Sequence, residues 1–476
     1  MEIKNNRKSV VPFLLEHSAS NPVSFHMPGH KGSRIYRENG FGEILEALME
    51  CDITEIPGAD NLFHTEGVIL ETMHRYRELY GSRESYILIN GSSAGLIAAV
   101  MTTVPQGGKL VMARNCHKSI YNAVSMAGGT PVYAYPEIVE GYGISGAVTA
   151  EEVRRLIEEN PDCSACILPS PNYYGICSDI EAIAEVVHKA GKVLIVDQAH
   201  GAHLKFFDRY APYGKSMAAE NLGADIVINS THKTLASFTQ TAVVNICSDR
   251  IDKYAFEDKL QLIESTSPSY ALMASLDVNA MLMENEGERL IREWRKNVDW
   301  FKSASVAVPG LKIMEHPLLD DTKINLDMSA YGLDGLALEE KLRAEGIFSE
   351  LATGNVTMCM TGIGNTRGDY ERLLAALEKI AGALEMKEES AVGEPVVLSN
   401  RILKQVGIPA EKERVPLEEG GGRVCAFPII PYPPGIPVVC PGEIIDNEIL
   451  DYVKSLRARG VNVMGIDDQG RIAVGK

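Results

Sequence analysis

Short apolar runs alternate with helical patterns through the middle of this chain. A helix is predicted at 149–160, where Thr149 and Glu152 have the spacing of a capping box. Another is predicted at 179–190 and ends before Gly191. Strands alternating with helices form a mostly parallel sheet, and strands this apolar are usually covered on both faces. The pattern therefore predicts an α/β fold, with strands at 85–90, 109–113, 130–135, 166–169, 193–197, 226–229 and 242–246.

The rest of the chain predicts further parts. A long helix is expected at 275–303, followed by a small α+β unit at 311–384. The polar stretch 387–395 is typical of a linker, and a last segment begins at about 396. We therefore expect a large domain with its N-terminal segment at 1–305, a small α+β domain at 306–390 and a C-terminal domain at 391–476.

Composition narrows the possible functions. The 476 residues are 45% hydrophobic, which suits a large core in more than one domain. No run of about 18 apolar residues and no secretory signal is present, so we expect no membrane partner. Nine irregularly spaced cysteines argue against a disulfide framework and for the cytoplasm. The net charge of −18 argues against a nucleic-acid partner, because phosphate binding requires clustered cations.

Four polar segments follow predicted strands, at 90–95, 114–119, 195–200 and 229–234. Because each comes directly after a strand, all four can gather at one edge of the sheet. Together their residue types fit one task, holding the phosphorylated pyridine aldehyde pyridoxal 5′-phosphate (PLP). A metal is not part of this prediction.

The first of these segments, NGSSAG, has small residues where a helix begins. Small residues let the backbone approach a phosphate, and a helix N-terminus offers free N–H groups. Ser92 and Ser93 can add hydroxyl donors. Taken alone, an ordinary turn with serine caps explains the segment better.

Two later segments carry the charged groups. Asp197 ends a buried strand, where a carboxylate can keep a pyridine nitrogen protonated, and Ala199 is small enough to lie under a ring. Lys233 can form a Schiff base with the aldehyde, while Ser230 and His232 can bind phosphate. An Asp that caps the strand and a surface Lys in a loop are the structural alternatives.

The segment 114–119 supplies His117, which can stack on the cofactor ring. A histidine after a strand is more often a cap or a satisfied polar residue. The four segments are specific only in combination.

At these residues the chain resembles the ornithine/lysine/arginine decarboxylase family, in its short bacterial form. That family has a large PLP domain of fold type I with a mostly parallel sheet, plus smaller α+β C-terminal domains. The resemblance extends over almost the whole chain. It rests on SFHMPGHKG, DITEIPGADNLFHTEGVI, NGSSAG, RNCHKS, VDQAHGAH, NSTHKTLASFTQTA, STSPSYALMASLD and YPPGIPVVCPGE.

The resemblance implies a role for each matching residue. Lys233 would carry PLP, Asp197 would pair with the ring nitrogen, and His117 and Ala199 would pack on the two faces of the ring. Thr266 would reach the phosphate of a neighbouring subunit's cofactor, which implies a homodimer with shared sites. The residues expected to bind phosphate are Ser92, Ser93, Ser230 and His232.

One position departs from the family pattern. Gln198 stands where the short form has Glu, so a charge is removed next to Asp197. The choice of substrate or a pKa could change with it, and the sequence leaves this effect open. PLP binding is not put in doubt by it.

The expected reaction is decarboxylation of a basic L-amino acid to an amine and CO₂, a lyase activity that fits polyamine biosynthesis. Lysine and arginine are favoured as substrates, and ornithine stays open. His117 or His200 would donate the proton to Cα. Glu443, Asp60 and Glu55 could each accept the distal cation of the substrate, although a structural ion pair is the favoured explanation for any one of them.

Other functions remain to be weighed. A PLP aminotransferase or lyase on the same fold would use the same residues, and CO₂ release separates them. A metal enzyme would have to use His200 and His203, or Cys163 and Cys166, and residues three apart in a strand chelate poorly. A NAD enzyme would need GxGxxG, which GSSAG does not match. A binding protein without catalysis would be favoured by loss of the lysine or aspartate.

Overall fold

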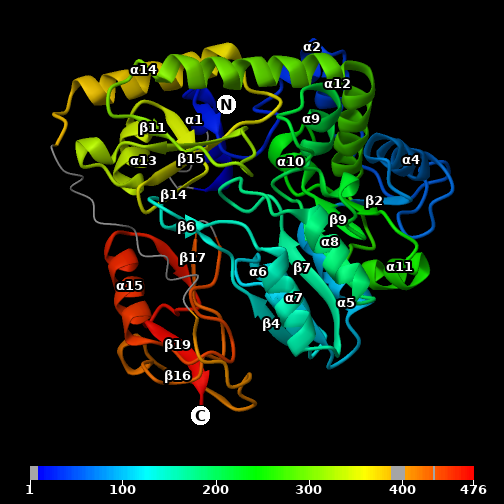
Figure 1. Ribbon diagram of the computed structural model, residues 1–476. Coiled ribbons are helices and arrows are strands. Elements are labelled where there is room, and N and C mark those ends of the chain that lie inside the picture. Colours follow the sequence, from blue (N-terminus) through cyan, green and yellow to red (C-terminus); the bar gives the residue numbers. More distant parts are fainter. Residues whose placement is uncertain (1–8, 388–401, 433–434) are drawn as a thin grey trace.

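The computed structural model describes residues 9–387, 402–432 and 435–476. Figure 1 shows three parts: a large sheet with its helices, a smaller unit beside it, and a C-terminal unit next to both. Apart from Lys387, the predicted linker 387–395 and the predicted start of the last segment lie outside the described residues.

The large part is built on a seven-stranded sheet with the order β2-β10-β9-β8-β7-β3-β4. β10 is antiparallel to both of its neighbours, and the other pairs are parallel, so the prediction of a mostly parallel sheet is confirmed. The strands are β2 (Glu84–Leu88), β3 (Lys109–Ala113), β4 (Thr130–Ala134), β7 (Cys163–Pro169), β8 (Val193–Asp197), β9 (Ile226–Asn229) and β10 (Ala242–Ile246).

Helices cover this sheet on both faces. Every residue of β9 and β10 is buried, whichever way its side chain points, as expected for strands between two helical layers. α5 packs on β9 and β10, while α7 and α8 pack on each other. The helices of this part are α4 (Val68–Tyr80), α5 (Gly91–Thr103), α6 (Lys118–Met126), α7 (Ala150–Glu159), α8 (Ile180–Lys189), α9 (Leu204–Tyr210), α10 (Thr231–Thr234) and α11 (Lys253–Gln261).

The start of α5 differs from the prediction. The segment expected to be a turn before Leu96 is already helical from Gly91. Gly91 has a φ of 78°, which glycine adopts at little cost. Gly95 lets the helix lie close to the sheet, because a Cβ at this position would come within 2.5 Å of Val244 Cγ2. Ser92 and Ser93 are therefore in the first turn of the helix.

The predicted capping box of α7 is only half formed. The Thr149 hydroxyl accepts the backbone N–H of Glu152, as expected for an N-cap. The Glu152 side chain binds Arg155 in the next turn. The Glu152 carboxylate therefore binds Arg155 instead of the backbone N–H of Thr149, which a complete capping box requires.

A 36-residue helix, α12 (Tyr270–Ser305), leads from the large part to the small unit and is longer than the predicted 275–303. The small unit holds an antiparallel sheet with the order β11-β12-β15-β14, covered by α13 (Gly335–Ala344) and α14 (Arg367–Gly382). Its strands are β11 (Lys312–Ile313), β12 (Lys323–Asp327), β13 (Ile347–Ser349), β14 (Leu351–Thr353) and β15 (Val356–Met360).

The N-terminal residues join this small unit. β1 (Val23–Phe25) pairs in parallel with β13, whereas the sequence prediction grouped the N-terminal segment with the large sheet. The first and last thirds of the described chain are thus connected by a strand pair. The remaining short elements before β11 are α1 (Val10–Ala19), α2 (Arg34–Glu38), α3 (Gly42–Glu46), β5 (Ile138–Val139) and β6 (Ile144–Ser145).

The C-terminal unit has its own hydrophobic core, built from residues between Leu403 and Val474. A buried ion pair fastens it to the large sheet: Arg114 Nη2 lies 2.9 Å from Glu443 Oε2, and both side chains are fully buried. Arg114 also donates to the carbonyl of Pro437. The helices and strands of the C-terminal unit are β16 (Lys412–Pro416), β17 (Ile430–Tyr432), α15 (Asn447–Ala458), β18 (Asn462–Met464) and β19 (Arg471–Gly475).

No helix in the described parts of the chain combines the length and the apolar character needed to cross a membrane. The longest helix, α12, carries charged residues along much of its length. All nine cysteines are free thiols.

We predict that Glu443→Gln destabilises the protein by about 3–5 kcal/mol, because the Arg114 guanidinium would stay buried without its counter-charge. Urea unfolding followed by circular dichroism measures the loss. Glu159→Gln is the matched control, because Glu159 pairs with Arg155 on the surface and such pairs contribute at most about 1 kcal/mol. Equal losses in the two variants would contradict this account of the ion pair.

Candidate active site

The four segments singled out in the sequence meet at one edge of the large sheet. The ends of β2, β3, β8 and β9 open onto two adjoining hollows, of about 360 and about 30 Å³. Ser92, His117, Tyr173 and Lys233 line both, so the hollows form one cavity. This size suits a small organic ligand.

Asp197 and Lys233 line the same part of this cavity. Burial raises the pKa of the Asp197 carboxyl, although Lys233 and the backbone N–H of Ala199 act in the opposite direction. Burial also lowers the pKa of the Lys233 amine, against the pull of Asp197 and Glu350. Each group is thus shifted toward its neutral form, and a free amine is a nucleophile.

Three histidines surround Lys233. His200 Nε2 lies 3.0 Å from Lys233 Nζ, and burial, followed by Lys233, lowers the His200 pKa well below its usual value. The same two causes lower the pKa of His117 to about 3. Burial lowers the pKa of His232 to about 4, and its Nδ1 lies 2.6 Å from the carbonyl of Thr241. All three rings are therefore neutral near pH 7.

The first turn of α5 faces the cavity with Ser92 and Ser93. The N-cap residue Asn90 leaves the helix without a side-chain cap, because its amide donates to the carbonyl of Ile263. The N–H groups of this first turn are therefore suited to an anion from outside the chain. Ser230 lies close by in sequence to Lys233, and its buried Oγ has no hydrogen-bond partner among the described residues.

These features fit PLP. A buried carboxylate and a buried amine line one hollow, and a helix N-terminus with two serines lies in the same cavity. Ser230 is not among the described residues that line the two hollows, but it lies three residues before Lys233 and its buried Oγ is unpartnered. Ala199 lines the smaller hollow with a short side chain, as expected for a residue that packs against a flat ring.

Several other lining residues were missed by the sequence reasoning. Tyr173 follows β7, so the rule that found the other segments could have found it. Glu350 and Tyr432 come from the small and the C-terminal units, and no strand-end pattern indicated them. The main-chain N–H of Met27 donates to Glu350 Oε2 at 2.9 Å, which ties this carboxylate to the N-terminal segment. Glu350 is the only acidic residue among the described residues that line the larger hollow.

The three carboxylates predicted to receive the substrate cation lie elsewhere. Glu443 is fully buried against Arg114, so the structural ion pair, which the sequence favoured over a role in substrate binding, is confirmed for this residue. Asp60 accepts backbone N–H groups of its own loop, including those of Asn61 and Gly67. Glu55 is exposed and binds the Asn61 amide. None of the three lines the cavity in the described chain.

Gln198 does not line the cavity of the described chain. Its carboxamide is fully buried, donates to Glu220 Oε2 at 2.9 Å, and accepts the backbone N–H of Ala219 at 2.8 Å. Glu220 also accepts the amides of Asn229 and Asn245. Glu220 thus supplies a carboxylate next to position 198. A Glu at position 198 would place a second negative charge against it.

The residues considered for a metal are not placed to bind one together. Cys163 and Cys166 lie in β7, where residues three apart point to opposite faces. His200 contacts Lys233, and His203 contacts Asp320. The described part of the chain holds no group of three or more His, Cys, Asp or Glu side chains placed to bind a metal ion.

Known proteins resemble the chain over nearly its full length. Two family models match, the major domain of the Orn/Lys/Arg decarboxylases at residues 10–325 and their C-terminal domain at residues 390–469. An arginine decarboxylase of Bacillus subtilis is 30% identical over 96% of this chain and 94% of its own. Lysine decarboxylase LdcA of Pseudomonas aeruginosa is 24% identical over 93% of this chain and 75% of its own.

Solved structures share the fold. The constitutive lysine decarboxylase of E. coli superposes with a TM-score of 0.75 at 21% identity, covering 98% of this chain and 82% of that one. L-Threonine transaldolase of Pseudomonas fluorescens gives a TM-score of 0.60 at 15% identity, covering 80% and 87%. The first similarity extends over all three parts of the molecule. Because the major-domain model alone covers more than half of the residues, the chain belongs to the ornithine/lysine/arginine decarboxylase family.

Proposed function

We propose that the protein binds PLP covalently through Lys233 and decarboxylates a basic L-amino acid to the corresponding amine and CO₂. The observation that carries the proposal is the placement of Asp197 and Lys233 in one hollow, beside the first turn of α5. Membership of the family supports the reaction. Relatives described as arginine and lysine decarboxylases favour these two substrates over ornithine.

The polar residues discussed above have separate tasks in this proposal. When bound, PLP supplies an aldehyde for the substrate amine and a protonated ring that draws electrons from Cα. Asp197 would hold the protonated ring nitrogen. The positive charge on that nitrogen would lower the pKa of Asp197 and so oppose the upward shift that burial causes. His117 offers a neutral ring for stacking. The first turn of α5 receives the phosphate, with Ser230 as a further donor. His232 becomes a donor only when the phosphate charge protonates its Nε2, because its Nδ1–H is already used by the carbonyl of Thr241.

His200 is proposed to handle the proton. Its Nε2 lies within hydrogen-bond distance of Lys233 Nζ, so a proton can pass between the two groups without rearrangement. Its lowered pKa keeps the ring neutral and able to accept. His117 also lines the hollow and is the other candidate for returning a proton to Cα.

Glu350 is proposed to hold the distal cation of the substrate. It lines the larger hollow, which Lys233 lines as well, and its Oε2 is fixed by the N–H of Met27. A carboxylate in a partly buried cavity favours a cationic side chain over a neutral one. This assignment replaces the three carboxylates that the sequence suggested.

A homodimer is part of the proposal, with Thr266 reaching the cofactor phosphate of the other copy. Thr266 is exposed and does not line the cavity of its own chain. Two residues earlier, Glu264 accepts the backbone N–H of Asn90, so this segment starts next to the phosphate end of the site. An exposed Thr266 is thereby available to a second chain.

The proposal predicts that the purified protein with PLP has a visible absorbance band and releases CO₂ from lysine or arginine. Lys233→Ala should lose both, because the amine that fixes the cofactor is gone. Lys109→Ala is the control, since Lys109 pairs with Asp162 at the start of β3 and should keep both properties. A protein that binds PLP but releases no CO₂ from lysine, arginine or ornithine would favour an aminotransferase or another lyase.

A second prediction concerns Glu350. Glu350→Gln should raise KM for the basic substrate about 10- to 100-fold, the loss expected for one charge-assisted hydrogen bond. The absorbance of bound PLP should change little. Glu345→Gln, a carboxylate of the small unit that pairs with Lys379 outside the cavity, should leave KM unchanged. An unchanged KM in Glu350→Gln, or an equal rise in Glu345→Gln, would contradict the assignment.

A further inference from the structure

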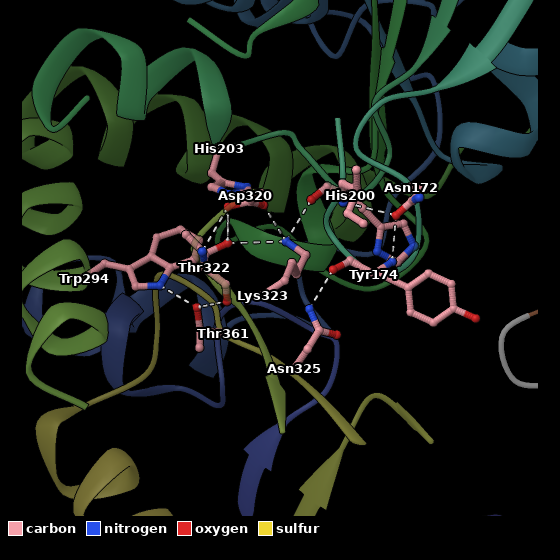
Figure 2. A network of polar contacts seen from close by, with 11 residues as sticks. Asn172, Tyr174, His200, His203, Trp294, Asp320, Thr322, Lys323, Asn325 and Thr361 are labelled. Atoms are coloured by element: carbon pink, nitrogen blue, oxygen red, sulfur yellow. Dashed lines mark hydrogen bonds and ion pairs between the residues drawn. The ribbon is translucent and has the colours of Figure 1, made fainter. Parts of the chain in front are cut away.

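A buried network of polar side chains lies behind the cavity and connects the small unit to the loop after β8 (Figure 2). Asp320, Thr322 and Lys323 come from the segment that leads into β12, and His203 comes from the loop. The four side chains are essentially inaccessible to solvent. The cavity is lined by none of them in the described chain.

Lys323 lies at the centre of this network. Its Nζ donates to Asp320 Oδ2 at 3.0 Å and to Thr322 Oγ1 at 3.4 Å, both within its own segment. The third contact crosses to the large part, where Nζ donates to the main-chain carbonyl of His200 at 3.0 Å. One ammonium thus connects the small unit directly to the main chain of His200 (Figure 2). The ring of this same residue contacts Lys233.

A second contact holds the same loop three residues later. His203 Nε2 lies 3.1 Å from Asp320 Oδ2 and 3.1 Å from Thr322 Oγ1. Burial lowers the pKa of His203, so the ring is neutral and the charges in the network are those of Asp320 and Lys323. Residues 200 and 203 are therefore both bound to the same small group of side chains.

Close backbone packing leaves this group little freedom. Gly175, in the loop after β7, has no room for a side chain, because a Cβ would come within 2.7 Å of Lys323 Cβ and Cγ. The backbone N–H of Asp320 donates to the carbonyl of Gly175 at 2.8 Å. The loop after β7 also carries Tyr173, whose ring centre lies 4.7 Å from that of His200. Lys323 is thus held between the two loops that border the cavity.

Stability alone is a weak reason for such a pair. Buried ion pairs lose hydration, and apolar residues of similar volume often replace them without loss of stability. An apolar side chain at 323, however, could not bind the carbonyl of His200. The distinctive contribution of Lys323 is therefore the fixed position of this main-chain oxygen.

We propose that Lys323 is a positioning residue for the reaction, because its bond to the His200 carbonyl orients the His200 imidazole against Lys233. This inference rests on the proposed function and adds the small unit to the machinery that handles the proton. The ionisable groups that face His200 are Lys233, Lys323, His117 and His232, with Tyr173 against its ring.

The test uses the paired variant Asp320→Asn/Lys323→Met in the full-length protein with PLP. Both charges are removed together, so neither is left buried without a partner. Thr361→Val is the matched control. Thr361 is equally buried and belongs to the same network, where it accepts the N–H of Trp294 and donates to the carbonyl of Thr322, but it has no contact with His200 (Figure 2).

We expect the paired variant to lower kcat about 10- to 100-fold with KM within about twofold, since small displacements of a catalytic group have effects of this size. The pH profile of the visible absorbance of bound PLP should shift as well. Thr361→Val should keep the kcat and the pH profile of the unmodified protein, even where its melting temperature falls equally. His203→Asn, which removes the other contact of the loop and keeps the Asp320–Lys323 pair, should lower kcat in the same sense.

The proposal is overturned if a folded paired variant has the kcat and pH profile of the unmodified protein. If the paired variant does not fold, Lys323→Gln decides in its place, because its shorter side chain keeps a polar group beside Asp320 but is too short to bind the His200 carbonyl. His203→Asn keeps the bond of Lys323 to His200 and tests only the second contact of the loop. The absorbance profile does not depend on decarboxylation. If the unmodified protein released no CO₂, the profile would still test the role of Lys323 separately from the proposed reaction.

Discussion

The site depends on a buried amine and a buried carboxylate at one edge of the large sheet. Lys233 follows β9 and Asp197 ends β8, and these neighbouring parallel strands bring the two residues into one hollow. Burial raises the pKa of Asp197 and lowers the pKa of Lys233, so it favours the neutral form of each side chain. The two residues are therefore poorly suited to a purely structural ion pair. A ligand with an electrophilic carbon and a basic nitrogen satisfies both. The serines of α5 and the three histidines line the cavity that would hold this ligand.

The other two units complete this site from outside the sheet. The small unit brings Glu350 to the cavity and, through Lys323, holds the main chain of His200. The C-terminal unit brings Tyr432 and is fastened by the Arg114–Glu443 pair. Arg114 lies three residues before His117, so this fastening acts on the same loop that carries a cavity residue. The cavity is therefore a property of three packed units.

The sequence was sufficient for the features that depend on local chemistry. The apolar strands, the polar segments after them and the small α+β unit are read from short-range patterns, and the mostly parallel sheet follows from their alternation. Contacts between distant segments were beyond this reasoning. Glu443 has the charge of a substrate ligand, and only packing shows that Arg114 neutralises it. Gln198 adjoins Asp197 in sequence, yet alternation along the chain turns it away from the cavity toward Glu220. Glu350 and Lys323 carry no local signal for their positions.

The central claim is that one small molecule is held between residues 197 and 233, with its covalent bond on Lys233. Reduction of the PLP-treated protein with borohydride, followed by peptide mapping by mass spectrometry, tests it most directly. The account predicts one stable pyridoxyl group per chain, on the peptide that contains Lys233. A modified lysine elsewhere, or no modification at a saturating PLP concentration, would contradict it.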